Sequence, residues 1–338
     1  MALIRLGRAL RPFLINWLIV GITNVYCNIG SMVILSGSSN LPLATKLAKE
    51  LGVPRVKREI GKFPNGETKL RLLEDIKDQT VVIIQSLQTP VNDYLIELLL
   101  LADAARRAGA KKIISVIPWL GYSKQDKVFS PGEPLSAAVV ARAISSAPID
   151  KVFLMELHNL KEAEFFTLPT RHISFIDGFV DELSDKVNEN SVVVSPDTGG
   201  NPRSDEFAKR LGLSVIYIDK KRHLVTGEVK ALGISGSVAG KDCLIFDDLI
   251  STGSTVVADS KYLRQHWAKS VTFCATHGIF ARGFSIFTGG EVDKIIISDT
   301  IPVPPVTTAT SNVVPAFVKV ISASKTIARA LRDEGLLV

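Results

Sequence analysis

From residue 32 onward, short runs of apolar and largely β-branched residues alternate with longer stretches of helical periodicity. Buried strands are predicted at the apolar runs, which are residues 32–35, 81–84, 113–117, 152–154, 192–194, 215–218, 244–246 and 295–297. Helices are predicted at residues 92–109, at 255–267 and from about 316 to the C-terminus. Because strands and helices alternate in this way in parallel sheets built from βαβ units, the sequence predicts an α/β fold.

A weak internal repeat indicates how this α/β chain is divided. Residues 81–118 and residues 243–277 share one plan, in which a strand, a polar loop and a helix of about four turns lead to a second strand. The length of 338 residues is sufficient for two hydrophobic cores. We therefore expect two similar doubly wound domains with mostly parallel sheets, at residues 32–178 and 179–338, with the last helix packing on the first domain.

Residues 1–31 do not share this pattern. Three arginines precede an apolar run at residues 13–20, and no acidic residue occurs before Glu50, as in a signal or transit peptide. The run is short for a membrane span. Two interpretations stay open, a non-native upstream start and a targeting segment, and the folded body is predicted to begin near Met32.

Composition narrows the possible functions of the body. The net charge is +6 and the pI is about 9.1, but the basic residues are scattered rather than clustered with aromatic residues. This distribution argues against nucleic-acid binding and suits a polyphosphate substrate. The cysteines, Cys27, Cys243 and Cys274, lack the spacing of a disulfide framework or a zinc site, and the last two lie in strand patterns as core residues. A cytoplasmic location without stable membrane association of the body is expected.

The most specific motif begins with two acids, Asp247 and Asp248, after a buried strand. Adjacent acids there can meet the paired hydroxyls of a ribose, and small residues at a helix start expose backbone N–H groups to a phosphate. The candidate ribose 5-phosphate residues are Asp247, Asp248, Ser251, Thr252, Gly253, Ser254 and Thr255. The alternative is an ordinary strand-to-helix turn. The segment resembles the ribose 5-phosphate loop of the type I phosphoribosyltransferase superfamily, which includes the 5-phosphoribosyl 1-diphosphate (PRPP) synthases.

A second segment, residues 62–67, resembles the F-x-[ND]-G-E segment of the PRPP synthases. The resemblance implies that Phe63, Asn65 and Glu67 bind the adenine of ATP across a subunit interface, so that the protein is a homo-oligomer. An aromatic ring can stack on a purine, while amide and carboxylate groups can recognise its edge. The alternative for Asn-Gly alone is a hairpin turn.

A third segment, residues 121–127, resembles the family's G-Y-x-R-Q-D-R. The resemblance implies that Lys124, Gln125 and Asp126 face the ATP phosphates and ribose. Lysine replaces the usual arginine at 124 and 127, and Gly132 replaces another arginine downstream. These departures put nucleotide affinity and donor preference in doubt because lysine lacks the planar bidentate group of arginine. The alternative is an exposed polar loop.

Two further segments imply a magnesium site. Residues 155–159, with Glu156 and Asn159, stand where the family has D-L-H-[AS], and residues 194–200 resemble its S-P-D-x-G-G. The resemblance implies that His158 and Asp197 hold Mg²⁺, although oxygen ligands are the commoner choice for that ion. A structural histidine and an ordinary turn are the alternatives.

A basic cluster completes the set. Residues 219–222 resemble the family's D-K-R-R at the base of a mobile loop, and the resemblance implies that Lys220 and Arg222 are catalytic. In a strand, Lys221 would point the other way. The implied reaction is transfer of a diphosphoryl group from ATP to ribose 5-phosphate, giving PRPP and AMP. Two alternatives are a phosphoribosyltransferase and a non-catalytic regulatory relative of the synthases.

Overall fold

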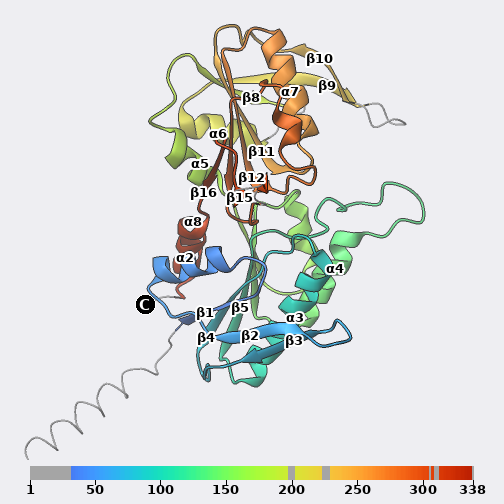
Figure 1. Ribbon diagram of the computed structural model, residues 1–338, viewed down its shortest axis with the longest axis vertical. Coiled ribbons are helices and arrows are strands. Elements are labelled where there is room, and N and C mark those ends of the chain that lie inside the picture. Colours follow the sequence, from blue (N-terminus) through green and yellow to red (C-terminus); the bar gives the residue numbers. More distant parts are fainter. Residues whose placement is uncertain (1–31, 197–201, 223–228, 304–305, 308–311, 337–338) are drawn as a thin grey trace, which may run out of the picture.

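The computed structural model describes residues 32–196, 202–222, 229–303, 306–307 and 312–336. Two lobes lie one above the other along the longest axis, and each is built on a central sheet (Figure 1). The first sheet has five strands in the order β1-β4-β5-β6-β7, and the second has seven in the order β10-β9-β8-β11-β12-β13-β16. Within the described ranges, no helix combines the length and the apolar character that crossing a bilayer requires.

The elements alternate along the chain as the apolar pattern predicts. In chain order they are β1 (Met32–Ser36), α2 (Leu41–Leu51), β2 (Arg58–Lys62), β3 (Thr68–Leu72), β4 (Thr80–Ile84), α3 (Val91–Arg107), β5 (Lys112–Ile117), α4 (Ser136–Ser146), β6 (Lys151–Met155), η1 (Leu160–Phe165), β7 (Thr170–Ile173), α5 (Ile176–Leu183), β8 (Ser191–Ser195), α6 (Pro202–Leu211), β9 (Val215–Arg222), β10 (Val229–Ile234), β11 (Asp242–Ile250), α7 (Ser254–Gln265), β12 (Ser270–Gly278), η2 (Ser285–Phe287), β13 (Lys294–Ser298), β14 (Val306–Thr307), β15 (Asn312–Val313), β16 (Val318–Ile321) and α8 (Ser324–Asp333).

The predicted α/β class with mostly parallel sheets is confirmed. Every neighbouring pair in the first sheet is parallel, and its strands lie side by side in chain order. In the second sheet only β9 and β10 pair antiparallel, and the winding reverses at β8, which lies between β9 and β11. The predicted repeat is also present, as β4-α3-β5 and β11-α7-β12. Ligands of such sheets bind where the winding reverses, which in this chain is at the carboxyl ends of β8 and β11.

The hydrophobic core differs from the two separate cores that were expected. One cluster lies under α3 and α4 in the first lobe, and another lies within the second lobe. A third runs across both lobes, from Leu43 and Phe175 to Phe207 and Phe246. Because this cluster includes side chains of both sheets, burial of apolar surface in each lobe depends on the other.

The C-terminal segment corrects one prediction. Residues 318–321 form strand β16 at the edge of the second sheet, and helix α8 begins only at Ser324. The run Val-Lys-Val-Ile favours a strand because its β-branched residues alternate with a lysine. Helix α8 packs on α2 of the first lobe, and Lys151 and Arg171 pair with Glu334 just beyond it, at 2.6 and 3.2 Å.

Three polar strands and several element ends also differ from the predictions. Strands β2, β3 and β7 carry charged or half-exposed residues, so they lack the apolar runs that identify buried strands. Strand β11 extends through Asp247 and Asp248 to Ile250, which shortens the predicted loop to residues 251–253. Cys243 and Cys274 are buried in β11 and β12, as predicted.

The two sheets meet at the carboxyl ends of their strands. The Ser86 hydroxyl, after β4, donates to the Thr300 carbonyl at 2.6 Å, and the Asn40 amide, after β1, donates to the Asp299 carbonyl at 2.7 Å. His277, at the end of β12, lies with Nε2 3.1 Å from the Glu156 carbonyl oxygen beyond β6. All six residues are buried, so each lobe satisfies polar groups of the other in a buried seam.

Helix α7 is followed by a left-handed residue that is not glycine, unlike three other helices. Gly52, Gly109 and Gly212 follow α2, α3 and α6 with φ values of 67°, 81° and 69°, and Trp267 takes the same left-handed conformation after α7, with φ of 66°. Glycine is favoured at such positions because a Cβ atom is strained there. Trp267 is 80% exposed, so little packing offsets the strain.

We expect Trp267→Gly to raise the free energy of unfolding by about 1 kcal/mol, because the strain of a left-handed non-glycine residue is removed. Urea denaturation of the two proteins measures the difference. Trp267→Ala is the matched control, since alanine removes the indole but keeps the Cβ atom. Equal stabilities of the glycine and alanine variants would contradict the assignment of strain.

Candidate active site

A cluster of charged side chains lies where the ends of β6, β8 and β11 converge. His158 follows β6 in the first lobe, Arg203 is the second residue of α6 after β8, and Asp248 lies near the end of β11. His158 Nδ1 is 2.7 Å from Asp248 Oδ2, and Arg203 Nη1 is 3.7 Å from Asp248 Oδ1. The structure therefore brings the predicted metal residue His158 against the predicted ribose residue Asp248.

The contact shifts the pKa values of both His158 and Asp248. The hydrogen bond to Asp248 raises the pKa of His158 above its ordinary value. Burial alone would raise the pKa of Asp248, but the His158 hydrogen bond and nearby positive charge outweigh burial, so this pKa lies below its ordinary value. Asp248 is 4% exposed and ionised, and the protonated Nδ1 of His158 donates to it.

Asp247 has a different environment from its neighbour. Its Oδ1 accepts the backbone N–H of Asp248 at 2.8 Å. Burial and then the charge of Asp248 raise the pKa of Asp247 well above its ordinary value. The two adjacent acids therefore differ in their tendency to ionise, and each Asp248 oxygen already faces a basic side chain, His158 or Arg203.

Arg203 was not predicted as a site residue. Its Nη2 donates to the carbonyl oxygens of Leu157 and His158, the latter at 2.9 Å, and its Nε is 3.8 Å from Glu156 Oε1. A cation at a helix N-terminus opposes the helix dipole, so its position in α6 is a signal that nearby anions hold it. That signal is available from the sequence once α6 is recognised.

Glu156 joins the charged cluster to the seam between the lobes. It is 2% exposed with φ of 41°, and its Oε2 accepts the Phe175 N–H at 2.8 Å and the Thr276 hydroxyl at 3.4 Å. Burial raises its pKa, while the Phe175 N–H and Arg203 lower it. The replacement of aspartate by glutamate in this segment thus has a structural consequence, because the longer side chain reaches both lobes.

The predicted phosphate loop lies beside the acids. Gly253 has φ of 88°, and a Cβ atom there would lie 2.5 Å from Cζ of Phe287, so glycine is required. Gly253 caps α7 without a side chain of its own, and the Ser254 N–H donates to Thr252 Oγ1 at 3.4 Å, which leaves the next amides of the first turn available to an anion. Ser251 and Thr252 are half-buried, Thr252 Oγ1 is 3.2 Å from Ser254 Oγ, and Ser254 and Thr255 are exposed.

The predicted ATP residues occupy two separate places. Lys124 is exposed, the Gln125 side chain accepts the Ser136 hydroxyl at 2.6 Å, and Asp126 Oδ2 accepts the Asn159 amide at 2.9 Å beside His158. These residues therefore border the charged cluster.

The remaining predicted ATP residues lie at the tip of the hairpin between β2 and β3, the turn that was the alternative interpretation of Asn-Gly. The hairpin is on the first lobe at the end away from the second (Figure 1). Phe63 is 46% exposed, Asn65 Oδ1 accepts the Glu67 N–H at 3.3 Å, and Glu67 is exposed. The hairpin conformation leaves these side chains on the surface, and the structure shows no contact between them and Asp126 among the described residues.

Two other sets of predicted residues are located only in part. Lys220 and Arg222 lie at the end of β9, opposite Ala231 and Val229 of β10, at the edge of the second sheet. Asp197 lies outside the described residues. Among the residues that the structure describes, no three His, Cys, Asp or Glu side chains form a metal cluster.

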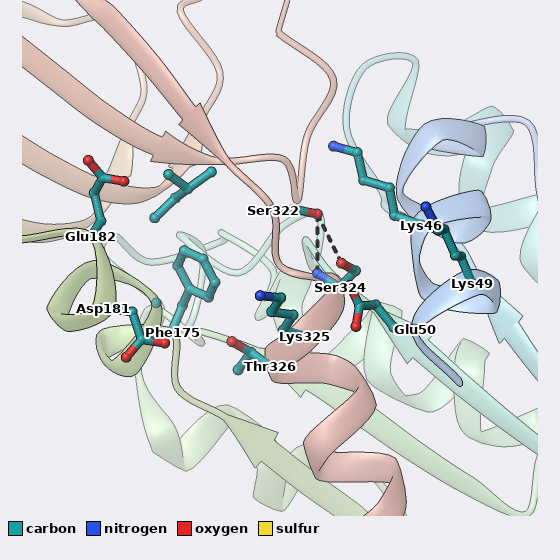
Figure 2. Close-up of a pocket in the computed structure, with 12 residues that line it drawn as sticks. Lys46, Lys49, Glu50, Phe175, Asp181, Glu182, Ser322, Ser324, Lys325 and Thr326 are labelled. Carbon is teal, nitrogen blue, oxygen red and sulfur yellow. Dashed lines mark hydrogen bonds between the residues drawn. The ribbon is translucent and has the colours of Figure 1, made fainter. Parts of the chain in front are cut away.

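A cleft elsewhere in the molecule is separate from this site. It has a volume of about 440 Å³ and lies between α2, α5 and α8, with Lys46 and Lys49 on one side, Asp181 and Glu182 on the other and Lys325 between them (Figure 2). None of the predicted site residues lines it. The charged cluster, and not this cleft, carries the predicted chemistry.

The reversed winding at β8, the acidic pair of β11 and the open helix start after Gly253 define a phosphoribosyltransferase-type α/β protein with two tandem lobes. Residues 32–147 match the family described as the N-terminal domain of ribose phosphate pyrophosphokinase, and residues 175–284 match the phosphoribosyl transferase domain family. These matches cover both lobes of the chain.

Individual relatives agree with these domain matches. The chain is 36% identical to the ribose-phosphate pyrophosphokinase of Campylobacter jejuni over 80% of this chain and 87% of that protein. It is 35% identical to that of Thermotoga maritima over 89% and 94%. The crystal structure of phosphoribosylpyrophosphate synthetase from Mycobacterium smegmatis superposes with a TM-score of 0.76 at 30% identity, covering 90% of this chain and 99% of that one. The chain belongs to the ribose-phosphate pyrophosphokinase family.

Glu162, next to the charged cluster, generates a pH-dependent prediction. Burial raises its pKa from 4.5 to about 7, and the side chain is 1% exposed. Between these pH values the folded protein keeps a proton that the unfolded chain releases, so the free energy of unfolding falls as pH rises from 4.5 to about 7. The Glu162→Gln variant has no carboxyl group at this position, so its free energy of unfolding lacks this decrease.

Urea unfolding at pH 5 and pH 8 measures both proteins. The stability of the wild type relative to Glu162→Gln should fall by about 2–3 kcal/mol between the two conditions. Glutamine is a suitable replacement because its amide oxygen can still accept the Asn159 N–H. Parallel pH profiles for the two proteins would rule out the raised pKa.

Proposed function

We propose that the chain transfers the diphosphoryl group of ATP to ribose 5-phosphate, giving PRPP and AMP. The observation that carries the proposal is the contact of His158 and Arg203 with Asp248, which joins the predicted metal segment to the predicted sugar segment. The names of the similar proteins from C. jejuni and T. maritima support the same activity.

Alignment of the two substrates accounts for most of the proposed catalysis. The first amides of α7 and the hydroxyls of Ser254 and Thr255 bind the 5-phosphate, and Asp247 meets the sugar hydroxyls. The anomeric oxygen then attacks the β-phosphorus of ATP, and the bond between the α,β-bridging oxygen and this phosphorus breaks to release AMP. Holding these atoms in line requires little covalent help from the protein.

Charge stabilisation is assigned to Lys220 and Arg222. Phosphoryl oxygens and the bridging oxygen gain negative charge as transfer proceeds, and two cations at the end of β9 would stabilise it. Asp248, held by His158 and Arg203, keeps the two lobes in register while these groups act.

Magnesium is proposed as the cofactor. The Nε2 atom of His158 makes no hydrogen bond among the described residues, and the His158 side chain is 41% exposed, so it can receive a ligand. Mg²⁺ bound mainly through substrate phosphates needs few protein ligands, which agrees with the sparse donor set here. His158 and Asp197 would hold the ion, which would neutralise phosphate charge.

A homo-oligomer is proposed from the resemblance of residues 62–67 to the PRPP synthases. In that arrangement, Phe63, Asn65 and Glu67 bind the adenine of an ATP molecule whose phosphates lie at Asp126 of a neighbouring subunit. The exposed ring of Phe63 supports this arrangement. A cytoplasmic location is proposed because the cysteines lack the spacing of a disulfide framework.

The direct test incubates the purified protein with ATP, Mg²⁺ and ribose 5-phosphate. PRPP and AMP are the expected products in equal amounts, as resolved by ion-exchange chromatography and ³¹P NMR. ADP in place of AMP would indicate ordinary kinase chemistry. Absence of any turnover, with ATP still bound, would instead favour the non-catalytic regulatory alternative.

Lys220→Ala and Arg222→Ala should each lower kcat by roughly 10²–10³-fold with little change in KM, as for loss of a preorganised oxyanion donor. Steady-state kinetics with ATP and ribose 5-phosphate measure the effect. Lys221→Ala is the matched control within the same strand, and it should lose much less because adjacent strand residues face opposite ways. Equal losses at all three positions would show a general surface or folding effect.

A further inference from the structure

Asn159 makes side-chain contacts in two directions. Its Oδ1 accepts the Lys161 N–H at 3.1 Å, and its Nδ2 donates to Asp126 Oδ2 at 2.9 Å. An amide can do both because it has an acceptor at one end and a donor at the other. The side chain thereby connects the segment after β6 to the loop after β5.

The first of these contacts fixes the orientation of the second. Asn159 is the N-cap of η1, and Glu162 completes a capping box by accepting the Asn159 N–H at 2.8 Å. Glu162 is 1% exposed, so the box is anchored in the interior. Both the backbone and the side chain of Asn159 are therefore held before a substrate arrives.

The second contact restrains a loop that lacks regular structure. Residues 121–135, between β5 and α4, contain neither helix nor strand, and most of them are exposed. Among the described residues, Asn159 is the only hydrogen-bond partner of the Asp126 carboxylate. This bond holds the Asp126 carboxylate beside His158, since His158 precedes Asn159 directly in the chain.

We infer that Asn159 is a positioning residue for the nucleotide: it holds Asp126 at a fixed distance from His158, so that the ATP-binding loop and the predicted metal segment act as one surface. The inference rests on the proposed function, in which Asp126 contacts ATP. Ribose 5-phosphate binds in the other lobe, beside α7, so loss of the bond affects the nucleotide alone.

Asn159→Ser separates positioning from capping. Serine is a good N-cap and keeps the contact with η1, but its hydroxyl is too short to reach Asp126 as well. The expected result is an ATP dissociation constant about tenfold higher, as for loss of one hydrogen bond to a charged group, with unchanged ribose 5-phosphate affinity and unchanged Tm. Isothermal titration calorimetry with ATP and Mg²⁺, without ribose 5-phosphate, measures nucleotide affinity without turnover.

A double-mutant cycle gives the matched control. Asp126→Ala should weaken ATP binding. Adding Asn159→Ser to it should cause no further loss of ATP affinity, because the partner of Asn159 is already absent. Wild-type ATP affinity in Asn159→Ser, equal losses for ATP and ribose 5-phosphate, or additive effects in the double variant would overturn the inference. A wild type that binds ATP with this pattern and forms no PRPP would refute the proposed function and leave the positioning role standing.

Discussion

The structure depends on one constraint, which is that the carboxyl ends of two parallel sheets face each other across a dry boundary. Strand ends expose carbonyl and N–H groups that must find partners when water is excluded. Here Ser86, Asn40 and His277 supply them across the boundary, and Glu156 binds Phe175 on one side and Thr276 on the other. Removing Glu156 would leave polar groups of both lobes without partners.

This boundary also determines where chemistry can occur. Ligands of α/β sheets bind at carboxyl ends, and in this chain the carboxyl ends of both sheets converge on one place. Asp248 is an example, because it contacts His158 from the first lobe and Arg203 from the second, and both contacts favour its ionised form. A separate first lobe would lack the carboxylate, and a separate second lobe would lack the histidine. The site therefore requires the tandem arrangement.

The sequence was sufficient for the apolar central strands of both sheets and for the repeated unit, because buried parallel strands are continuous apolar runs. It was insufficient for β7 and the β2–β3 hairpin, whose polar residues carry no such signal. The site residues were also predicted only in part. His158 and Asp248 were found from motifs, but their contact is tertiary, because the two residues are 90 positions apart in the chain. Arg203 could be found from the sequence only after α6 was recognised, and the bond from Asn159 to Asp126 is a tertiary contact that spacing does not encode.

The packing of α8 on α2 affects synthesis of the protein on the ribosome. Leu43 and Leu47 of α2 share a buried cluster with Ile327 and Leu331 of α8, which are translated after strand β16 of the second sheet. Until α8 leaves the exit tunnel, that face of the nascent first lobe stays exposed to solvent and to chaperones. The order of translation thus places completion of the N-terminal lobe after almost all of the second lobe has been made, so a stop codon just before α8 would leave both lobes incomplete.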